Sequence, residues 1–279
     1  LQGKTILVTG GGSGLGLSMA HQFVKLGANV GICGRAAEKL QVAAKELQSH
    51  GTKVAYHTVD VRDYDAVGEM FEQLTSQLGA INGLVNNAAG NFYAASEDLT
   101  PNGFKTIVDI VLHGTFNCTQ HFGKRLIDAK GDSNHGGTVL NIVTTYTESG
   151  SSFVLPSACA KAGVYAMTTS LAYEWATYNI RLNAIAPGPF PTEGAWTRLM
   201  PKDFEAAYLK RLPMGRYGRH DELSNLAAFL MSDLSPYING ECITIDGGEH
   251  RASGQFNFLT QLAPRAELKK FFASLRPKK

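Results

Sequence analysis

A glycine-rich segment directly after the first apolar run limits the possible folds of this chain more than any other feature. Residues 5–8 have the length and apolar character of a buried strand, residues 9–16 read T-G-G-G-S-G-L-G, and a helical pattern follows at residues 17–25. Glycines permit a tight turn and let backbone N–H groups approach an anion at the positive end of a helix. This order predicts a loop that holds the pyrophosphate of a dinucleotide, although glycines alone could also serve only the turn. The expected contacts are Gly10, Ser13, Gly14, Leu15 and Gly16.

Short apolar runs alternate with longer amphipathic stretches along the rest of the chain. The runs of strand length are residues 5–9, 29–33, 54–58, 83–86, 138–142, 181–186 and 242–245. The helical stretches are residues 17–25, 36–49, 64–78, 104–129, 157–178 and 221–231. Strands that alternate with helices of this length predict right-handed βαβ units. The predicted fold class is α/β, a doubly wound parallel sheet of Rossmann type, in a single domain over residues 1–279.

Two segments interrupt this alternation. Residues 188–219 are rich in proline, glycine and aromatic residues, and they follow a strand end, where a substrate lid would lie. Residues 249–279 form a C-terminal tail whose basic side chains are most simply solvated.

The composition argues against several classes of protein. A formal net charge of +2 gives no reason to expect a nucleic-acid partner. The four cysteines contain no C-x-x-C pair and the eight histidines lack the spacing of metal ligands, so we predict neither a metal site nor a disulfide framework. Unpaired cysteines also indicate a reducing compartment. No apolar run reaches the roughly 18 residues of a membrane span, so no membrane insertion is expected. The expected location is the cytoplasm of a bacterium, or the mitochondrial matrix if a targeting segment has been trimmed.

The end of the second predicted strand bears on the choice of dinucleotide. A fold of this kind that takes NAD usually places a carboxylate there for the ribose 2′-hydroxyl. The sequence has Cys33-Gly34-Arg35 instead, and an arginine can pair with a 2′-phosphate. We therefore expect NADP, used as NADPH. The alternative is that Arg35 is a solvated residue that starts the next helix.

Motifs spread over nearly the whole chain resemble the short-chain dehydrogenase/reductase superfamily. They are the loop at residues 9–16, Asp60-Val61, the N-N-A-A-G run at residues 86–90, Lys161, and Pro187-Gly188 with Thr192. The resemblance implies that Asp60 and Val61 contact adenine and that Lys161 holds the nicotinamide ribose. Thr192 would contact the carboxamide. Further implied cofactor contacts are Asn87, Ala88, Ala89, Gly90 and Pro187. The resemblance also implies a homotetramer that pairs long helices.

One departure from the superfamily pattern points to a particular branch. Ordinary ketone reductases carry a Y-x-x-x-K helix turn that supplies the proton, whereas this chain has Ser157 four residues before Lys161 and Tyr146 farther upstream. With the run N-A-A-G-N-F at residues 87–92, this pattern resembles the 2,4-dienoyl-CoA reductases of the mitochondrial type. In those enzymes the residues matching Asn91 and Tyr146 hold the thioester carbonyl, and the lysine matching Lys161 binds the ribose. The serine matching Ser157 helps to place the nicotinamide.

The chemistry of that branch fits these residue types. Hydride delivered to the far end of a conjugated diene moves negative charge onto the thioester oxygen, which needs hydrogen-bond donors. A tyrosine hydroxyl and an asparagine amide are suitable donors. The expected activity is NADPH-dependent reduction of 2,4-dienoyl-CoA to 3-enoyl-CoA in the degradation of unsaturated fatty acids, with an acyl-CoA as substrate.

Each assignment has a plainer alternative. Tyr146 could be a loop aromatic packed on the lid, Asn91 a turn residue, and Ser157, after Pro156, a helix cap. Thr144 lies near the position of the catalytic serine of many superfamily members, but a threonine at a strand end is ordinary. The whole chain could also be a reductase of a 3-oxoacyl thioester or a ketone, or a catalytically silent NADPH-binding protein.

Overall fold

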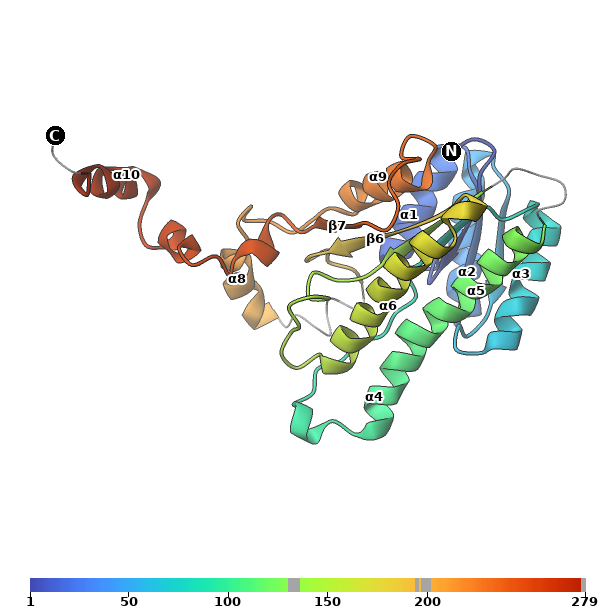
Figure 1. Cartoon of the computed structure of the whole chain (residues 1–279), viewed down its shortest axis with the longest axis horizontal. Coiled ribbons are helices and arrows are strands. Elements are labelled where there is room, and N and C mark those ends of the chain that lie inside the picture. The colour runs from blue at the N-terminus through green and yellow to red at the C-terminus, as the bar shows by residue number, and fades with distance from the viewer. Residues whose placement is uncertain (130–135, 194–195, 197–201, 277–279) are drawn as a thin grey trace.

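One parallel sheet of seven strands organises the computed structural model, which describes residues 1–129, 136–193, 196 and 202–276 (Figure 1). The strands are β1 (Thr5–Thr9), β2 (Asn29–Gly34), β3 (Val54–Thr58), β4 (Gly83–Asn86), β5 (Gly137–Ile142), β6 (Ile180–Pro187) and β7 (Cys242–Ile245). Their order is β3-β2-β1-β4-β5-β6-β7, and every neighbouring pair is parallel. The predicted fold class is therefore confirmed. Because the order reverses between β1 and β4, the crevice beyond the ends of these two strands is where such a sheet binds its ligand.

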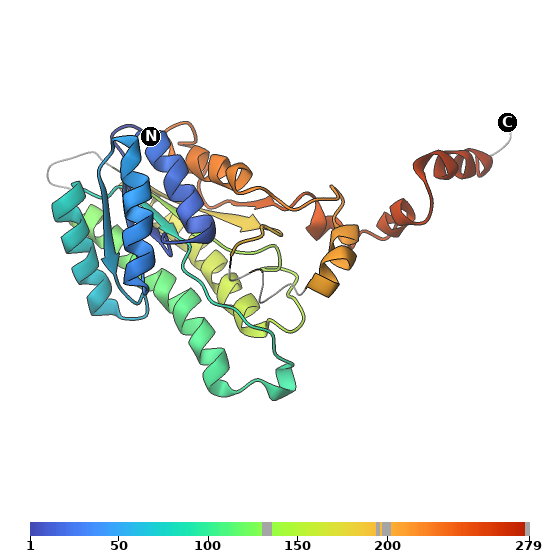
Figure 2. The same ribbon diagram turned by 180° about the vertical axis from the view of Figure 1, so that it is seen from behind.

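Helices cover both faces of the sheet (Figures 1 and 2). They are α1 (Gly14–Lys25), α2 (Ala37–Leu47), α3 (Tyr64–Leu78), α4 (Pro101–Val108), α5 (Gly114–Asp128), α6 (Leu155–Glu174), α8 (Lys202–Arg211), α9 (His220–Met231) and α10 (Arg265–Ser274). The short 3₁₀ turns are η1 (Gln48–His50), η2 (Ser96–Asp98), η4 (Ala176–Tyr178), η5 (Glu249–Arg251) and η6 (Asn257–Gln261). Within these described ranges, no helix is long and apolar enough to cross a membrane.

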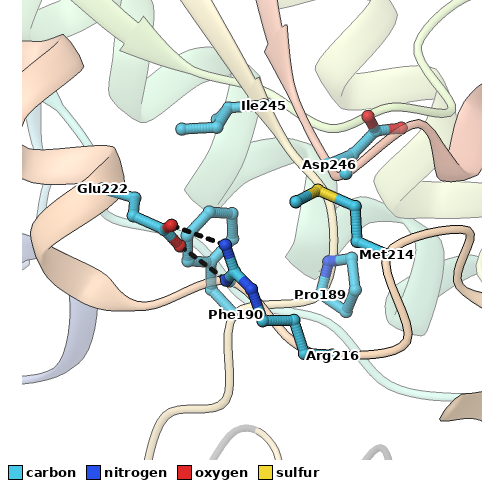
Figure 3. A pocket seen from close by; sticks show the side chains of 9 residues that line it. Pro189, Phe190, Met214, Arg216, Glu222, Ile245 and Asp246 are labelled. Atoms are coloured by element: carbon cyan, nitrogen blue, oxygen red, sulfur yellow. Dashed lines mark hydrogen bonds and ion pairs between the residues drawn. The ribbon is translucent and has the colours of Figure 1, made fainter.

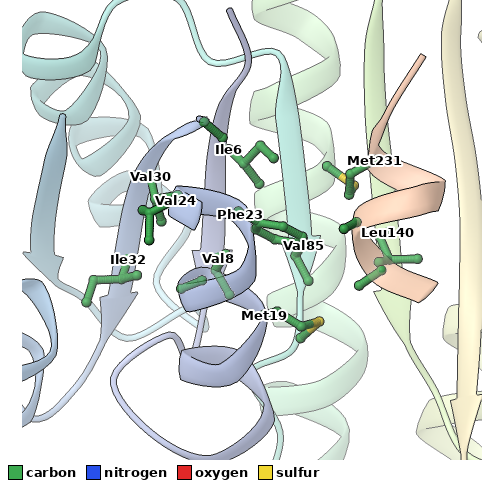
Figure 4. Packing of buried hydrophobic residues seen from close by; sticks show 14 of the residues in the cluster. Ile6, Val8, Met19, Phe23, Val24, Val30, Ile32, Val85, Leu140 and Met231 are labelled. Atoms are coloured by element: carbon green, nitrogen blue, oxygen red, sulfur yellow. The ribbon is translucent and has the colours of Figure 1, made fainter. Parts of the chain in front are cut away.

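The largest hydrophobic core lies between the sheet and the helices α1, α2 and α9 (Figure 4). Helix α1 places Met19, Phe23 and Val24 on one buried face, at the spacing that brings side chains onto one side of an α-helix. They pack against β1 and β2 residues such as Val8 and Ile32. Burial of these side chains fixes where α1 begins, and with it the loop that joins α1 to β1.

The predicted helix at residues 104–129 is divided in the structure. Helices α4 and α5 are joined by a π-helical turn, η3 (Asp109–His113). The Thr115 hydroxyl donates to the Val111 carbonyl at 2.6 Å inside this region. A Cβ on Gly114 would lie 2.5 Å from the side chain of Val61, so α5 can approach the end of the third strand this closely only with glycine at its start. Apolar periodicity does not reveal such a turn because the pattern continues through it.

The two segments that interrupt the alternation also contain helices. The predicted lid, residues 188–219, includes α8, while residues 194–195 and 197–201, with Arg198 among them, lie outside the described residues. The C-terminal tail includes η5, η6 and α10, and it extends away from the sheet in both views (Figures 1 and 2).

Replacement of Phe23 by alanine should remove the largest buried side chain of α1 and leave a cavity between this helix and the sheet. We expect the free energy of unfolding to fall by about 3–5 kcal/mol, the usual range for Phe→Ala in a core. Equilibrium unfolding in guanidinium chloride measures this. Phe204→Ala on the exposed face of α8 is the matched control, and an equal loss in both variants would contradict the packing described here.

Candidate active site

One hydroxyl fixes the glycine loop after β1 to the segment after β4. Thr9 Oγ1 accepts hydrogen bonds from the backbone N–H groups of Asn87 and Ala88, both at 3.0 Å. Asn87 Nδ2 returns a hydrogen bond to the Thr9 carbonyl at 3.0 Å. The two segments therefore share one edge of the sheet at the reversal of strand order. Thr9 and its bonding role were not among the predicted site residues.

The loop itself needs glycine at several positions. Gly10 and Gly14 have φ values of +64° and +55°, in the left-handed region that side chains rarely adopt. A Cβ on Gly16 would collide with the Gly10 carbonyl and with Asn87 Nδ2. Ser13 is the N-cap of α1 but makes no side-chain capping bond. The glycine loop and the first backbone N–H groups of α1, which have no acceptor within the helix, thus form a site suited to an anion.

The predicted adenine contacts, Asp60 and Val61, lie after β3, and the first of them is paired with a neighbouring arginine. Arg62 Nε and its terminal nitrogen donate to the Asp60 carboxylate at 2.6–3.0 Å. This pairing, with a smaller contribution from Arg35, holds the pKa of Asp60 below its usual range. Val61 is buried, and its carbonyl accepts from Asn117 Nδ2 at 2.9 Å. Arg62 was missed from the sequence, where its only signal is a basic residue two positions after Asp60.

Arg35 lies at the end of β2, exposed and just outside the next helix. Helix α2 begins at Ala37 with Ala36 as its N-cap, so Arg35 lies just before the helix, and its side chain is exposed, as the alternative of a solvated residue also expects. Its charge contributes to the lowered pKa of Asp60, the residue at the end of the neighbouring strand β3.

Lys161 is buried on α6, with only 6% of its surface exposed. Its Nζ donates to the carbonyl of Ile142, the last residue of β5. Burial lowers the pKa of Lys161 to about 8, because the charged ammonium loses its water. A buried cation at the carboxyl end of the sheet is suited to bind the hydroxyls of a sugar.

Tyr146 and Ser157 meet beside this lysine. The Tyr146 hydroxyl and Ser157 Oγ are 3.2 Å apart in a hydrogen bond, although the tyrosine is on the loop after β5 and the serine on α6. Ser157 is 3% exposed. The alternative that Ser157 caps the helix is wrong, because Val154 is the N-cap and Leu155 is the first helical residue. The structure therefore brings the predicted phenol and the predicted serine together.

Asn91 lies on the loop after β4. Its Oδ1 accepts from the Phe92 N–H at 2.9 Å, a local bond typical of a turn, and its Nδ2 has no hydrogen bond to another described residue. The Ala94 N–H donates to the Phe153 carbonyl at 3.0 Å, which ties this loop to the loop that carries Tyr146. Burial, and secondarily Tyr146, raise the pKa of Tyr93, a neighbour that sequence reasoning missed.

The segment after β6 closes the crevice from the other side. Pro187 ends β6, and the Thr192 methyl group lies 3.3 Å from the position that a Cβ on Gly14 would occupy. Thr144 Oγ1, two residues after β5, is buried and has no hydrogen-bond partner in the part of the chain that the structure describes. An unpaired buried hydroxyl at this edge is satisfied if a bound group reaches it. The predicted cofactor residues thus lie at the ends of five strands, β1, β2, β3, β4 and β6, and on helix α6.

A separate cavity of about 180 Å³ lies behind the lid (Figure 3). Its walls include Pro189, Phe190, Met214 and Ile245, and an ion pair joins Arg216 to Glu222 across it at 2.7–2.9 Å. The guanidinium lowers the pKa of Glu222 to about 2. This cavity contains neither Tyr146 nor Lys161. Elsewhere in the described part of the chain, no three His, Cys, Asp or Glu side chains are grouped as a metal site requires.

The arrangement defines a dinucleotide-dependent oxidoreductase, and comparisons with known proteins give its family. The family described as "Enoyl-(Acyl carrier protein) reductase" matches residues 10–250. A relative from Caenorhabditis elegans, named "Probable 2,4-dienoyl-CoA reductase 3 [(3E)-enoyl-CoA-producing]", is 45% identical over 89% of this chain and 81% of its own. One from Bacillus subtilis, named "Probable 2,4-dienoyl-CoA reductase [(2E)-enoyl-CoA-producing]", is 42% identical over 89% and 97%.

Solved structures agree with this assignment. A short chain dehydrogenase from Bacillus anthracis is 43% identical, covers 88% of this chain and 96% of its own, and superposes with a TM-score of 0.80. Other solved neighbours contain NADP or NADPH. The chain belongs to the short-chain dehydrogenase/reductase family. A nicotinamide cofactor fits the crevice, where a Cβ on Gly16 would fill the cradle and Thr144 has an unpaired hydroxyl.

Replacement of Lys161 by methionine should stabilise the cofactor-free protein at neutral pH. The pKa of this lysine is about 8 in the folded chain and 10.5 in the unfolded chain, so at pH 7 the folded state holds a poorly solvated charge at a cost of about 3 kcal/mol. Methionine removes that cost. Wild-type stability should approach that of the variant as the pH rises from about 8 to 10.5, because both states then lose the proton.

Chemical unfolding of both proteins from pH 7 to 10.5 measures this difference. A difference that does not change with pH would contradict a buried, charged Lys161. The same substitution should weaken cofactor binding at every pH.

Proposed function

We propose that the chain reduces 2,4-dienoyl-CoA thioesters to 3-enoyl-CoA with NADPH, in the degradation of unsaturated fatty acids. The observation that carries this proposal is the hydrogen bond between the loop residue Tyr146 and Ser157 on α6. It brings a phenol from the loop after β5 to the helix turn of Lys161, where an ordinary ketone reductase of this family carries the tyrosine on the helix itself. The names of the C. elegans and B. subtilis relatives support the same reaction.

The position of the phenol suits a distant oxygen. In ketone reduction the oxygen is bonded to the carbon that accepts the hydride, so the acid stands beside the nicotinamide. In a 2,4-dienoyl thioester the hydride goes to carbon five, and the electrons move through the diene to the thioester oxygen, several bonds away. A tyrosine on the loop after β5 can follow that oxygen outward.

The residues of this chain have separate tasks in the proposed reaction. The bound cofactor supplies the hydride. The Tyr146 hydroxyl and Asn91 Nδ2 donate to the thioester oxygen and stabilise the dienolate, and loss of one such donor usually costs about 3–4 kcal/mol of barrier. Lys161 binds the ribose hydroxyls, and Ser157 holds the phenol and helps to place the nicotinamide. A proton from water or from the Tyr146 phenol then adds at carbon two of the dienolate, the double bond between carbons three and four remains, and the 3-enoyl product is complete.

Two features support NADPH as the cofactor. The exposed Arg35 stands where a 2′-phosphate is expected, and the Asp60 carboxylate is already paired with Arg62.

A homotetramer is the proposed assembly, because the family pairs long helices of the α5 and α6 kind. Degradation of fatty acids would place the chain in bacterial cytoplasm or in the mitochondrial matrix.

Consumption of NADPH with 2,4-hexadienoyl-CoA and with acetoacetyl-CoA, followed as loss of absorbance at 340 nm, tests the proposal. We expect turnover of the dienoyl ester alone. Turnover of acetoacetyl-CoA alone would indicate a ketone reductase in which Lys161 acts with an acid other than Tyr146. No turnover of either ester, despite NADPH binding, would indicate a silent binding protein.

Replacement of Tyr146 by phenylalanine should lower kcat at least about a hundredfold, since one donor to the thioester oxygen is lost. NADPH affinity should stay near normal because the phenol is expected to contact the substrate. Steady-state kinetics and NADPH fluorescence titration separate these effects. Tyr56→Phe on β3, at the far edge of the sheet, is the matched control, and full activity of Tyr146→Phe would remove this residue from the mechanism.

Replacement of Arg35 by alanine should raise the KM for NADPH by tenfold or more and leave that for NADH within about twofold, because only NADPH carries the 2′-phosphate. Initial rates with both cofactors at saturating substrate measure the ratio. Lys39→Ala, one helical turn farther along α2, controls for the general loss of positive charge. Equal changes for the two cofactors would exclude Arg35 as the phosphate ligand.

A further inference from the structure

Glu249 joins the start of the C-terminal tail to helix α8 of the predicted lid. The Tyr208 hydroxyl donates to Glu249 Oε1 at 2.7 Å, a length typical of a hydroxyl bonded to a carboxylate. Burial, and then this hydrogen bond, raise the pKa of Tyr208 above its usual range, so the hydroxyl keeps its proton and remains a donor. Helix α8 and the start of the tail lie side by side in both views (Figures 1 and 2).

The base of the tail is fixed against the segment that follows β6. Asp246 accepts from the N–H groups of Gly248 at 2.8 Å and His250 at 2.7 Å, and it also pairs with the His250 ring. The Gly188 N–H donates to the carbonyl of the last β7 residue at 3.0 Å. A Cβ on Gly188 would lie 2.5 Å from the Cβ of Asp246, so the two segments approach this closely only with glycine there. Glu249 therefore acts from a fixed point beside the predicted cofactor segment.

Tyr208 connects this base to an aromatic cluster in the lid. The centroid of its ring lies 6.2 Å from that of Trp196 and 6.3 Å from that of Tyr217. The rings of Trp196 and Tyr217 meet edge to face at 4.8 Å. At these separations aromatic rings attract one another beyond the effect of burial alone. Tyr208 thus belongs both to the polar contact with the tail and to the aromatic cluster.

Trp196 continues the connection into the cofactor crevice. Its backbone N–H donates to the Thr192 carbonyl at 3.1 Å. The Thr192 methyl group in turn lies 3.3 Å from the position that a Cβ on Gly14 would occupy in the glycine loop. Thr192 is also the residue expected to contact the carboxamide of the cofactor. An unbroken series of contacts therefore runs from Glu249 to the edge where the dinucleotide is expected.

We propose that Glu249 is a positioning residue for the cofactor site. By holding Tyr208 it keeps Trp196 in place, and through Trp196 it holds Thr192 against the glycine loop. Loss of the carboxylate releases α8 and lets Thr192 move away from the cofactor. The proposal rests on the nicotinamide crevice and on the role expected of Thr192, and it requires no particular acyl substrate. A failed assay with dienoyl-CoA would therefore leave it standing.

Quenching of tryptophan fluorescence by acrylamide in the cofactor-free protein tests the contact with the lid. The chain has two tryptophans, and Trp175 is 8% exposed, so a change in quenching reports mainly on Trp196. Glu249→Ala and Tyr208→Phe should each raise the quenching constant about twofold, and the double variant should raise it no further, because each change removes the same hydrogen bond. Glu249→Gln keeps an acceptor oxygen and should match the wild type. Unchanged quenching, or additive increases, would overturn the proposal.

Calorimetric titration with NADPH tests whether this contact acts on the cofactor site. Glu249→Ala should raise the dissociation constant about three- to tenfold, as expected of a residue that acts through its neighbours, and Glu249→Gln should leave it within about twofold. Glu267→Ala removes the same charge from an exposed position of α10 and is the matched control. Thermal unfolding followed by circular dichroism verifies that the variants are folded.

Two outcomes of this titration would contradict the proposal in different ways. Increased quenching with unchanged NADPH affinity in Glu249→Ala would show that Glu249 holds only the lid, and it would overturn the positioning role. Wild-type protein that binds no NADPH would contradict the cofactor crevice itself, and the positioning role with it.

Discussion

The Thr9 hydroxyl joins the two halves of the sheet at the place where the strand order reverses. It accepts hydrogen bonds from the backbone N–H groups of Asn87 and Ala88, and these bonds hold the segments after β1 and β4 together. This contact ties the glycine loop to the segment after β4, at the end of the sheet where α1 begins. Without these hydrogen bonds, the glycine loop and the segment after β4 would be held less firmly against each other.

Lys161 shows how the same edge combines stability and binding. Its ammonium group donates in the interior to the carbonyl of Ile142, and no carboxylate among the described residues pairs with it. A charge in this position destabilises the folded chain, yet it is ready to meet the hydroxyl groups of a sugar. The buried hydroxyl of Thr144 is likewise unpaired. Both groups belong to a crevice whose polar atoms are completed by what binds there.

Much of the fold could be predicted from the sequence because a buried parallel sheet leaves local signals. The strand runs and the glycine loop were found, with bounds within a residue or two. The π-helical turn at Asp109–His113 was not visible because apolar periodicity continues through it, and α8 was hidden by a proline- and glycine-rich surrounding.

The site was only partly predictable for a related reason. The residue types of Lys161 and Tyr146 could be chosen from spacing and resemblance. The hydrogen bonds of Thr9 span 78 and 79 residues, and the pairing of Arg62 with Asp60 depends on how β3 ends, so neither could be found from local pattern. Ser157 was open to a capping role until the start of α6 was known.

The placement of Tyr146 on a loop separates two properties that an ordinary Y-x-x-x-K helix turn keeps together. On a helix, the distance between acid and lysine is set by the backbone and cannot change without moving the cofactor. Here the lysine stays with α6, while the loop after β5 can change in length or sequence on its own. Such a scaffold is open to redesign, because in the proposed reaction the reach of this phenol toward shorter or longer conjugated substrates could be altered without rebuilding the dinucleotide site.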